Sequence, residues 1–186
     1  MTDIRALSIE QPWATLIQRG AKRLETRSWH TNYRGPLVIH ASKKFPLYCQ
    51  GLLRMSSFYN GVGRIPAKAL PRGVGLCVCI LRACVKVSEL YKLKVLDFTP
   101  SVDELTFGDF SEGRYAWLLE HQYDFIEPIP AKGALGLWPW IKEQYQAAYE
   151  SPQIVCTSCG SSDELRLSKL GCFLCAKCRS SLETAS

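Results

Sequence analysis

The sequence predicts an α+β fold, a small mixed β-barrel flanked by helices. About six strand-like segments accompany only two or three helix-like ones, with no regular alternation of strand and helix, and 13 glycines and 10 prolines separate them. With 186 residues, the chain can bury one core of ordinary size and carry a small attachment. We therefore expect a main domain over residues 1–150 and a small module over residues 151–186.

The N-terminal region predicts a strand followed by a helix. Residues 5–9 are the short strand, and Pro12 suits the first position of the helix. The buried stripe of this helix would be Trp13, Leu16 and Ile17, and Gly20 would end it.

The segment after Gly20 alternates with period two, which predicts a strand over residues 22–27. In a regular strand Lys22 and Glu25 would point to opposite faces. A bulge or bend near Gly20 would bring the two side chains together, and the sequence leaves both arrangements open.

Further elements follow from apolar runs bounded by glycine and proline. The apolar run over residues 74–87 is the expected centre of the sheet. Other expected strands cover 35–42, 115–119 and 122–126. Two further helices are expected, over 45–55 and over 140–149. The buried stripe of the first of these would be Tyr48, Leu52 and Met55. A segment over 128–140, with Trp138 and Trp140, would close the domain, and Ser151-Pro152 would be the linker.

Positive charge is concentrated in the first half of the chain. Residues 1–90 hold 14 Lys and Arg against 4 Asp and Glu, whereas residues 91–186 hold 9 against 13, which gives the net +6. Such asymmetry favours a polyanionic partner, although a basic face kept for solubility would look the same.

Within the basic half, residues 20–35 mix cations with aromatic rings. Cations suit phosphates and flat rings suit bases, so this segment predicts a nucleotide-binding surface. Its candidate binding residues, with one helix residue before it and one lysine after it, are Trp13, Lys22, Glu25, Arg27, Trp29, Tyr33, Arg34 and Lys43. The alternative for Glu25 is a simple ion pair with Lys22 or Arg27.

Four cysteines near the C-terminus predict a metal site. Cys156, Cys159, Cys175 and Cys178 form the pattern C-x2-C-x15-C-x2-C, whose thiolates can close a tetrahedral shell around structural Zn²⁺. The alternative second pair is Cys172 with Cys175. A zinc ribbon of this kind would serve as a structural module or a contact for another protein.

The remaining cysteines and the first residues of the chain indicate the cellular compartment of the protein. Cys77, Cys79 and Cys84 lie in the apolar run and are expected to be packed in the core, while the position of Cys49 stays open. The first residues lack the apolar core of an export signal, and we expect no contact with a membrane. Because the cysteines are expected to be reduced thiols, we expect the protein in the cytoplasm, with the nucleus as the alternative.

Several motifs together resemble one family. The Gln-Pro-Trp turn at residues 11–13, the Gly-x-Lys-x-x-Glu-x-Arg core at 20–27, Tyr33-Arg34-Gly35 and the Pro-x-x-Gly-x-x-Gly-x-Trp tail from Pro130 are similar to the ASCH domain. The resemblance covers roughly residues 4–142. It implies a PUA-like mixed β-barrel, a superfamily in which binding of RNA or of modified bases is common.

The resemblance also places Lys22, Glu25 and Arg27 at the ASCH cleft beside Trp13. Some bacterial ASCH proteins hydrolyse N4-acetylcytidine with a Lys of this motif, a Thr three residues later and a distant Glu. Lys22 matches that Lys, but Glu25 stands at the Thr position, and the candidates for the distant acid are Asp103, Glu104 and Asp109.

We therefore expect an RNA-binding ASCH protein whose cleft recognises a nucleobase, a modified one included. The alternative is an enzyme acting on RNA or nucleosides, a ribonuclease or an N4-acetylcytidine amidohydrolase, with Lys22 and Glu25 as catalytic residues. A third alternative is a protein-interaction module. His40 lies in an apolar strand, where a structural, hydrogen-bonded histidine is expected.

Overall fold

A computed structural model describes residues 4–140, 166–167 and 173–174 of the chain; for Val95 and for residues 166–167 and 173–174 it describes the backbone alone. The chain divides into two compact units, Met1–Trp140 and Ile141–Ser186, which are treated separately below. The four predicted zinc ligands, Cys172, the expected helix over 140–149 beyond Trp140 and the expected linker at Ser151-Pro152 lie outside the described residues.

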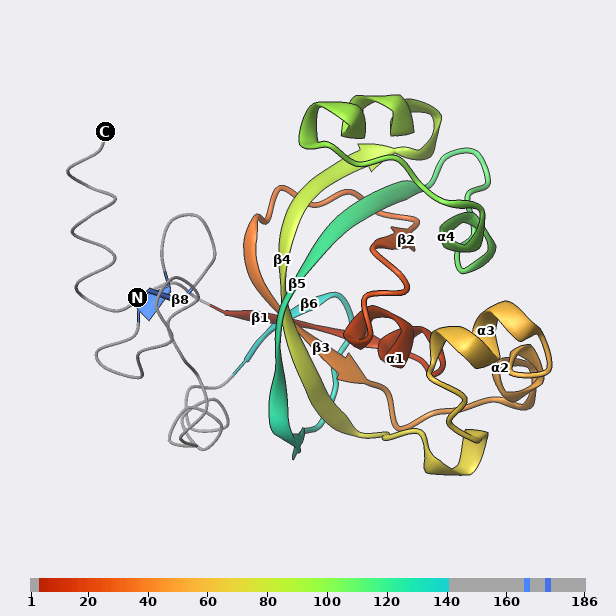
Figure 1. Ribbon diagram of the computed structural model, residues 1–186. Coiled ribbons are helices and arrows are strands. Elements are labelled where there is room, and N and C mark those ends of the chain that lie inside the picture. The colour runs from red at the N-terminus through yellow and green to blue at the C-terminus, as the bar shows by residue number, and fades with distance from the viewer. Residues whose placement is uncertain (1–3, 141–165, 168–172, 175–186) are drawn as a thin grey trace. The chain divides into compact units, whose positions relative to one another are not determined.

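Six strands of the first unit form one curved mixed sheet (Figure 1). Its order is β2-β5-β4-β3-β1-β6, and β1 and β3 are its one parallel pair. The strands are β1 (Arg5–Ile9), β2 (Leu24–Arg27), β3 (Gly35–Ala41), β4 (Val74–Lys86), β5 (Tyr115–Pro130) and β6 (Leu137–Pro139). The predicted α+β class is confirmed.

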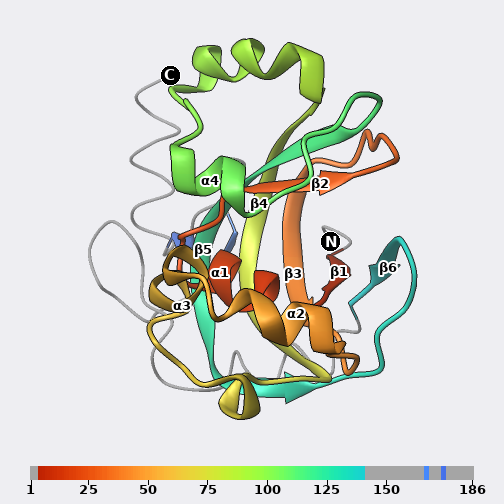
Figure 2. The same ribbon diagram turned by 90° about the vertical axis from the view of Figure 1, so that its right-hand side faces the viewer.

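Short helices gather on one side of this sheet. Helices α1, α2 and α3 stand in front of the strands in Figure 2, with α4 above them. They span α1 (Trp13–Gln18), α2 (Leu47–Leu52), α3 (Ser56–Gly61) and α4 (Val102–Thr106), with 3-10 helices η1 (Ala67–Ala69) and η2 (Val87–Leu96). None of the described helices has the length and apolar character needed to cross a membrane.

The core lies between the sheet and α1. Aliphatic side chains of β1, β3 and β4 pack around Trp117, which is fully buried. Leu16 and Ile17 of α1 are buried as predicted, while Trp13, the first residue of the helix, is half-buried. The apolar run expected at the centre of the sheet is β4, which pairs with β3 on one side and β5 on the other.

Two predicted elements differ from the observed ones. The expected strands over 115–119 and 122–126 are one strand, β5, because bulges let the chain continue through its polar middle. The expected helix over 45–55 is shorter, α2 at 47–52, and a separate helix, α3, begins at Ser56 after the chain turns extended at Met55. Tyr48 and Met55, predicted to be buried, are 66% and 46% exposed, and Cys49 is buried in their place.

The second unit contains one described pair of strands. β7 (Arg166–Leu167) pairs with β8 (Phe173–Leu174) in antiparallel register. The pair lies, in sequence, between the two predicted cysteine pairs.

Candidate functional site

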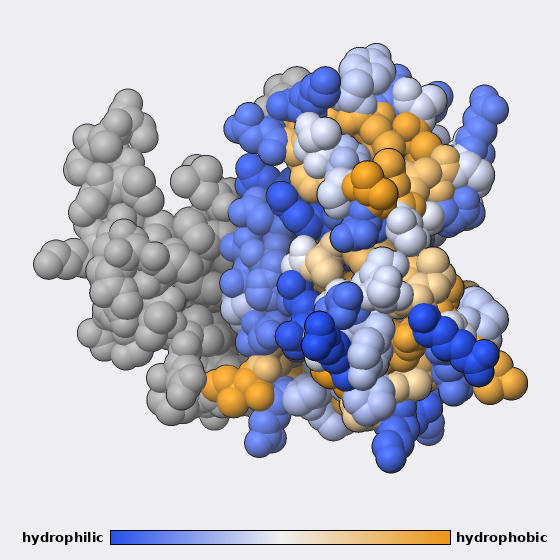
Figure 3. Space-filling model, turned by 45° about the vertical axis from the view of Figure 1, so that its right-hand side comes forward, coloured by the Kyte–Doolittle hydropathy of each residue, from blue (hydrophilic) through white to orange (hydrophobic). Residues whose placement is uncertain are grey.

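A cleft of about 460 Å³ opens beside α1 and the end of β1. Its walls come from β1, β2, the first three helices and the chain that follows α4. On the face shown in Figure 3, hydrophilic and hydrophobic side chains lie around a hollow between two parts of the surface. Four predicted binding residues, Trp13, Lys22, Glu25 and Arg27, line the cleft.

The chain bends after α1, and this bend brings Lys22 and Glu25 together. Gly20 has a φ of +70°, and the backbone N–H of Lys22 donates to the carbonyl of Leu16 over 3.0 Å. Because β2 begins only at Leu24, Lys22 is outside the alternation of the strand. Its Nζ lies 3.6 Å from Glu25 Oε2 and donates to the carbonyl of Leu24. Of the two arrangements that the sequence left open, the bend is the observed one.

Glu25 is shared between two cations. Arg27 Nε lies 3.1 Å from Glu25 Oε1 as an ion pair without the alignment of a hydrogen bond. The same guanidinium donates through Nη2 to the carbonyl of Ser8 at 3.1 Å, which ties β2 to β1 across the cleft. Lys22, Glu25 and Arg27 therefore form one charged group in the wall.

Burial dominates the electrostatics of Lys22. Its side chain is 1% exposed, and loss of solvation lowers its pKa from the ordinary value of 10.5, while the nearby carboxylates of Glu25 and Glu104 oppose that shift. A lysine with a lowered pKa inside a cleft is typical of functional sites.

Glu104 is the candidate acid that the structure places beside this motif. Both of its oxygens accept the N–H of Arg23 at 2.9 Å, and Oε1 also accepts the N–H of Leu24 at 2.6 Å. Burial raises the pKa of Glu104, and these backbone donors oppose the rise. Glu104 is not among the residues that line the cleft, so it acts as a clamp on the backbone between Lys22 and Glu25.

The other two candidate acids differ from Glu104. Asp103 is exposed on α4 and does not line the cleft, whereas Asp109 lines its mouth. The N–H of Ser111 donates to the Asp109 carboxylate and lowers its pKa. Of the three candidate acids, Asp109 is therefore the one that lines the cleft.

Apolar side chains form another part of the cleft lining, called the apolar wall below. Trp13 meets Phe58 edge to face with ring centroids 6.4 Å apart, and Phe58 meets Phe107 in the same way at 5.0 Å. Leu52 and Met55, from the end of α2 and the turn after it, extend this wall. The cleft therefore offers an aromatic and aliphatic side and a charged side.

Several cleft residues were missed by the sequence analysis. Among them are Ser8, Glu10, Thr26, Phe58, Phe107 and Arg114. Arg114 pairs with Asp109 at 3.3 Å and donates to the carbonyl of Thr26 at 3.1 Å. Glu10 and Ser8 precede the Gln-Pro-Trp turn, a signal that could have found them, but no local pattern marks Arg114.

The other predicted binding residues, Trp29, Tyr33, Arg34 and Lys43, do not line this cleft. Trp29 packs edge to face on Trp117 at 4.6 Å, and the Tyr33 hydroxyl donates to the carbonyl of Pro36. Arg34 donates to the carbonyls of Thr31 and Tyr33, and Lys43 is exposed. Their contact with bases or phosphates stays a prediction.

His40 has the structural role expected of it. It is 2% exposed, and its ring nitrogens contact Ser8 Oγ and the carbonyl of Ala131, each at 3.1 Å. A Cβ on Gly133 would lie 2.5 Å from Ser8 Oγ and 2.6 Å from His40 Cε1, so the backbone of the closing segment approaches at a distance that only glycine permits.

Comparison with known proteins agrees with the motifs. The chain matches the ASCH domain over residues 7–129. It is 58% identical over 145 residues to activating signal cointegrator 1 of Mus musculus, which covers 76% of this chain and 23% of that protein. It is also 58% identical over 40 residues to activating signal cointegrator 1 of Homo sapiens, 22% of this chain and 7% of that protein. The chain thus spans less than a quarter of the length of these relatives.

Solved structures similar to this chain include the crystal structure of ASCH from Zymomonas mobilis. It is 17% identical with a TM-score of 0.46, covering 77% of this chain and 92% of that one. A mutant of the same protein gives 18% identity and a TM-score of 0.47, covering 78% and 93%. On the match to residues 7–129, the chain belongs to the ASCH domain family.

Proposed function

We propose that the protein binds single-stranded RNA and receives one unpaired nucleobase in the cleft beside Lys22. The observation that carries this proposal is the pairing of a charged group, Lys22, Glu25 and Arg27, with an aromatic wall in one cleft of about 460 Å³. Single-stranded RNA is recognised through splayed bases that stack on aromatic rings and bond through their edges.

The charged side supplies both kinds of hydrogen-bonding group that a base edge needs. The Glu25 carboxylate accepts from a base amino or imino group, as carboxylates do from the N4 amino group of cytosine. Arg27 donates, and Trp13 adds a half-buried ring to the lining of the same cleft. The basic first half of the chain would add contacts to the phosphates. Recognition of a modified base is the finer form of this proposal, since the cleft has room beside its apolar wall for an added group.

An enzyme acting on the same ligand is the second candidate. The lowered pKa of Lys22 favours it, because a buried lysine that loses its proton readily can serve as a base or nucleophile. The acid that would act with it is Asp109 rather than Glu104, whose oxygens are taken up by backbone N–H groups. Thr26, one residue after the position that carries Thr in the amidohydrolases, also lines the cleft.

One experiment separates these functions. Binding and conversion of a labelled RNA pool containing modified cytidines are measured for the wild type, Lys22→Ala and Glu25→Gln, with the exposed Lys94→Ala as control. For a binding protein we expect salt-dependent affinity, about tenfold weaker in either cleft variant and unchanged in the control, with no product. Product that disappears in the cleft variants would establish the enzyme. Absence of both binding and product would contradict the proposal and leave an interaction module.

For the C-terminal unit we propose a structural zinc ribbon held by Cys156, Cys159, Cys175 and Cys178. The spacing of the cysteines supports it, as does the antiparallel pair β7–β8 between the two cysteine pairs in sequence. The role we give it is a contact with another protein. Replacement of Cys156 by Ser should remove one zinc ion per chain, measured by elemental analysis, and equal zinc content would contradict the ribbon. Replacement of Cys172 by Ser tests the alternative pairing.

A further inference from the structure

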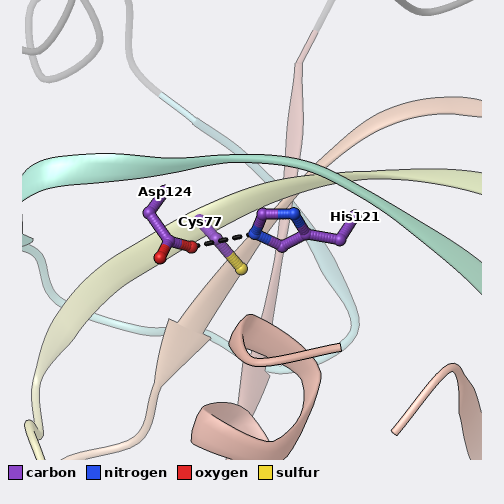
Figure 4. Close-up of side chains that lie close together, drawn as sticks. All are labelled: Cys77, His121 and Asp124. Atoms are coloured by element: carbon purple, nitrogen blue, oxygen red, sulfur yellow. Dashed lines mark hydrogen bonds and ion pairs between the residues drawn. The ribbon is translucent and has the colours of Figure 1, made fainter. Parts of the chain in front are cut away.

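A second cluster of metal-binding side chains lies on β4 and β5, outside the cleft. Cys77, His121 and Asp124 point toward one another, and the Asp124 carboxylate contacts the His121 ring (Figure 4). One ligand atom from each lies within 4.8 Å of the others. Within the described part of the chain, this is the one group of three such side chains at that distance.

A bulge in β5 creates this cluster. Cys77 is opposite Asp124 and Cys79 is opposite His121, while Tyr123 is opposite Val78 and Gln122 has no partner in the register. In a regular strand, residues three apart point to opposite faces of the sheet. The extra residue turns His121 to the same side as Asp124, where the Cys77 thiol lies.

The three groups suit zinc. A thiolate, an imidazole and a carboxylate are its usual ligands, and the two anionic ones would neutralise a divalent ion at a partly buried site. Ligand atoms at about 2.0–2.3 Å from a tetrahedral ion lie about 3.3–3.8 Å from one another, so the 2.8 Å contact between His121 Nε2 and Asp124 Oδ1 must open to admit the ion. His121 and Asp124, whose side chains are 32% and 50% exposed, can make that adjustment while Cys77 stays fixed in the core.

Oxidation is the competing chemistry for a thiol, and burial disfavours it. Cys77 has no exposed surface, so oxidants reach its thiol poorly. A metal ion can enter past the side chains of His121 and Asp124, which are 32% and 50% exposed.

The fourth position of such an ion would be open. Asp124 also lines a second cavity of about 450 Å³ with Thr15, Gln18 and Arg19. Thr15 is 2% exposed, and its hydroxyl has no hydrogen-bond partner among the described residues. We propose that Cys77, His121 and Asp124 bind one zinc ion whose remaining position takes a water molecule from this cavity.

Elemental analysis after equilibrium dialysis against buffered zinc tests the site on the full chain. We expect the double variant His121→Asn with Asp124→Asn to hold one zinc ion per chain fewer than the wild type. The matched control is His30→Asn with Asp103→Asn, an exposed histidine and an exposed aspartate outside the cluster, which should keep the wild-type content. Any zinc in the C-terminal unit cancels in this comparison.

Cobalt then identifies the thiol without altering the core. The spectrum of the Co²⁺-loaded wild type minus that of the double variant should contain a thiolate-to-metal charge-transfer band. Equal zinc content in the wild type and the double variant, or a difference spectrum without that band, would overturn the proposal. Both replaced residues are exposed, so the variants should fold.

Discussion

Burial of the Lys22 cation is energetically costly, because at 1% exposure its side chain has lost almost all contact with water. Glu25 and the carbonyl of Leu24 replace only part of that solvation, and Glu25 is also shared with Arg27. A ligand group that accepts a hydrogen bond from Lys22 would supply a further partner. This is the physical reason why we place Lys22 in the proposed binding site.

The lowered pKa of Lys22 predicts how stability depends on pH. Between the native pKa and 10.5 the unfolded chain holds a proton that the folded chain has lost, so the free energy of unfolding rises with pH. Below that window both states are protonated, and burial of the charge costs the full amount. We expect the wild type to gain stability relative to Lys22→Met as pH rises, by up to about 1.4 kcal/mol per pH unit.

Urea unfolding at a series of pH values from neutral upward measures this difference. The exposed Lys94→Met is the control, and its difference from the wild type should not change with pH. A difference between wild type and Lys22→Met that stayed constant up to pH 10.5 would show that Lys22 has its ordinary pKa when folded.

At the scale of elements, α4 and β2 are joined by one side chain. Ser101 caps α4 by accepting the N–H of Glu104, and Glu104 in turn accepts the N–H groups of Arg23 and Leu24 at the start of β2. The short helix thereby fixes the backbone on which the Lys22 and Glu25 side chains stand.

Glu104→Gln tests this clamp. The amide of Gln keeps one acceptor oxygen but replaces the other with an NH2 group, which would face a backbone N–H donor. We therefore expect the free energy of unfolding to fall by about 1–3 kcal/mol. The exposed Glu112→Gln should change it by less than about 0.5 kcal/mol. Urea denaturation measures both, and equal stability of the two variants would mean that Glu104 does not hold β2.

The sequence predicted those elements whose pattern is local. Apolar runs marked β3 and β4, and the Gln-Pro-Trp turn marked α1, because burial of one face imposes a period on the chain. The end of α2 at Leu52 and the separate helix α3 were missed, since Met55 lies outside both helices although its spacing fits a buried stripe. Arg114 reaches the cleft only because β5 pairs with β2, a long-range contact that leaves no mark near residue 114.

At the scale of the whole molecule, charge separates the two units. Residues 1–140 hold 18 Lys and Arg against 12 Asp and Glu, whereas residues 141–186 hold 5 against 5, so the net +6 belongs to the first unit. Zinc bound by four thiolates would make the second unit more negative. We therefore expect the proposed attraction to a polyanion to come from the unit that contains the cleft.

This separation predicts that residues 1–140 bind RNA as the full chain does. All the residues that line the cleft lie between Ser8 and Arg114, and the core is closed by Trp140, which stacks on Phe125. With two to four phosphates neutralised, the logarithm of affinity should fall with the logarithm of salt concentration at a slope of about −1.4 to −2.8. Fluorescence anisotropy should give affinities within about twofold and equal slopes for the two forms, because the C-terminal unit carries no net positive charge with which to release counterions from RNA. A truncated chain that remained folded by circular dichroism but bound tenfold more weakly would instead place an RNA contact in residues 141–186.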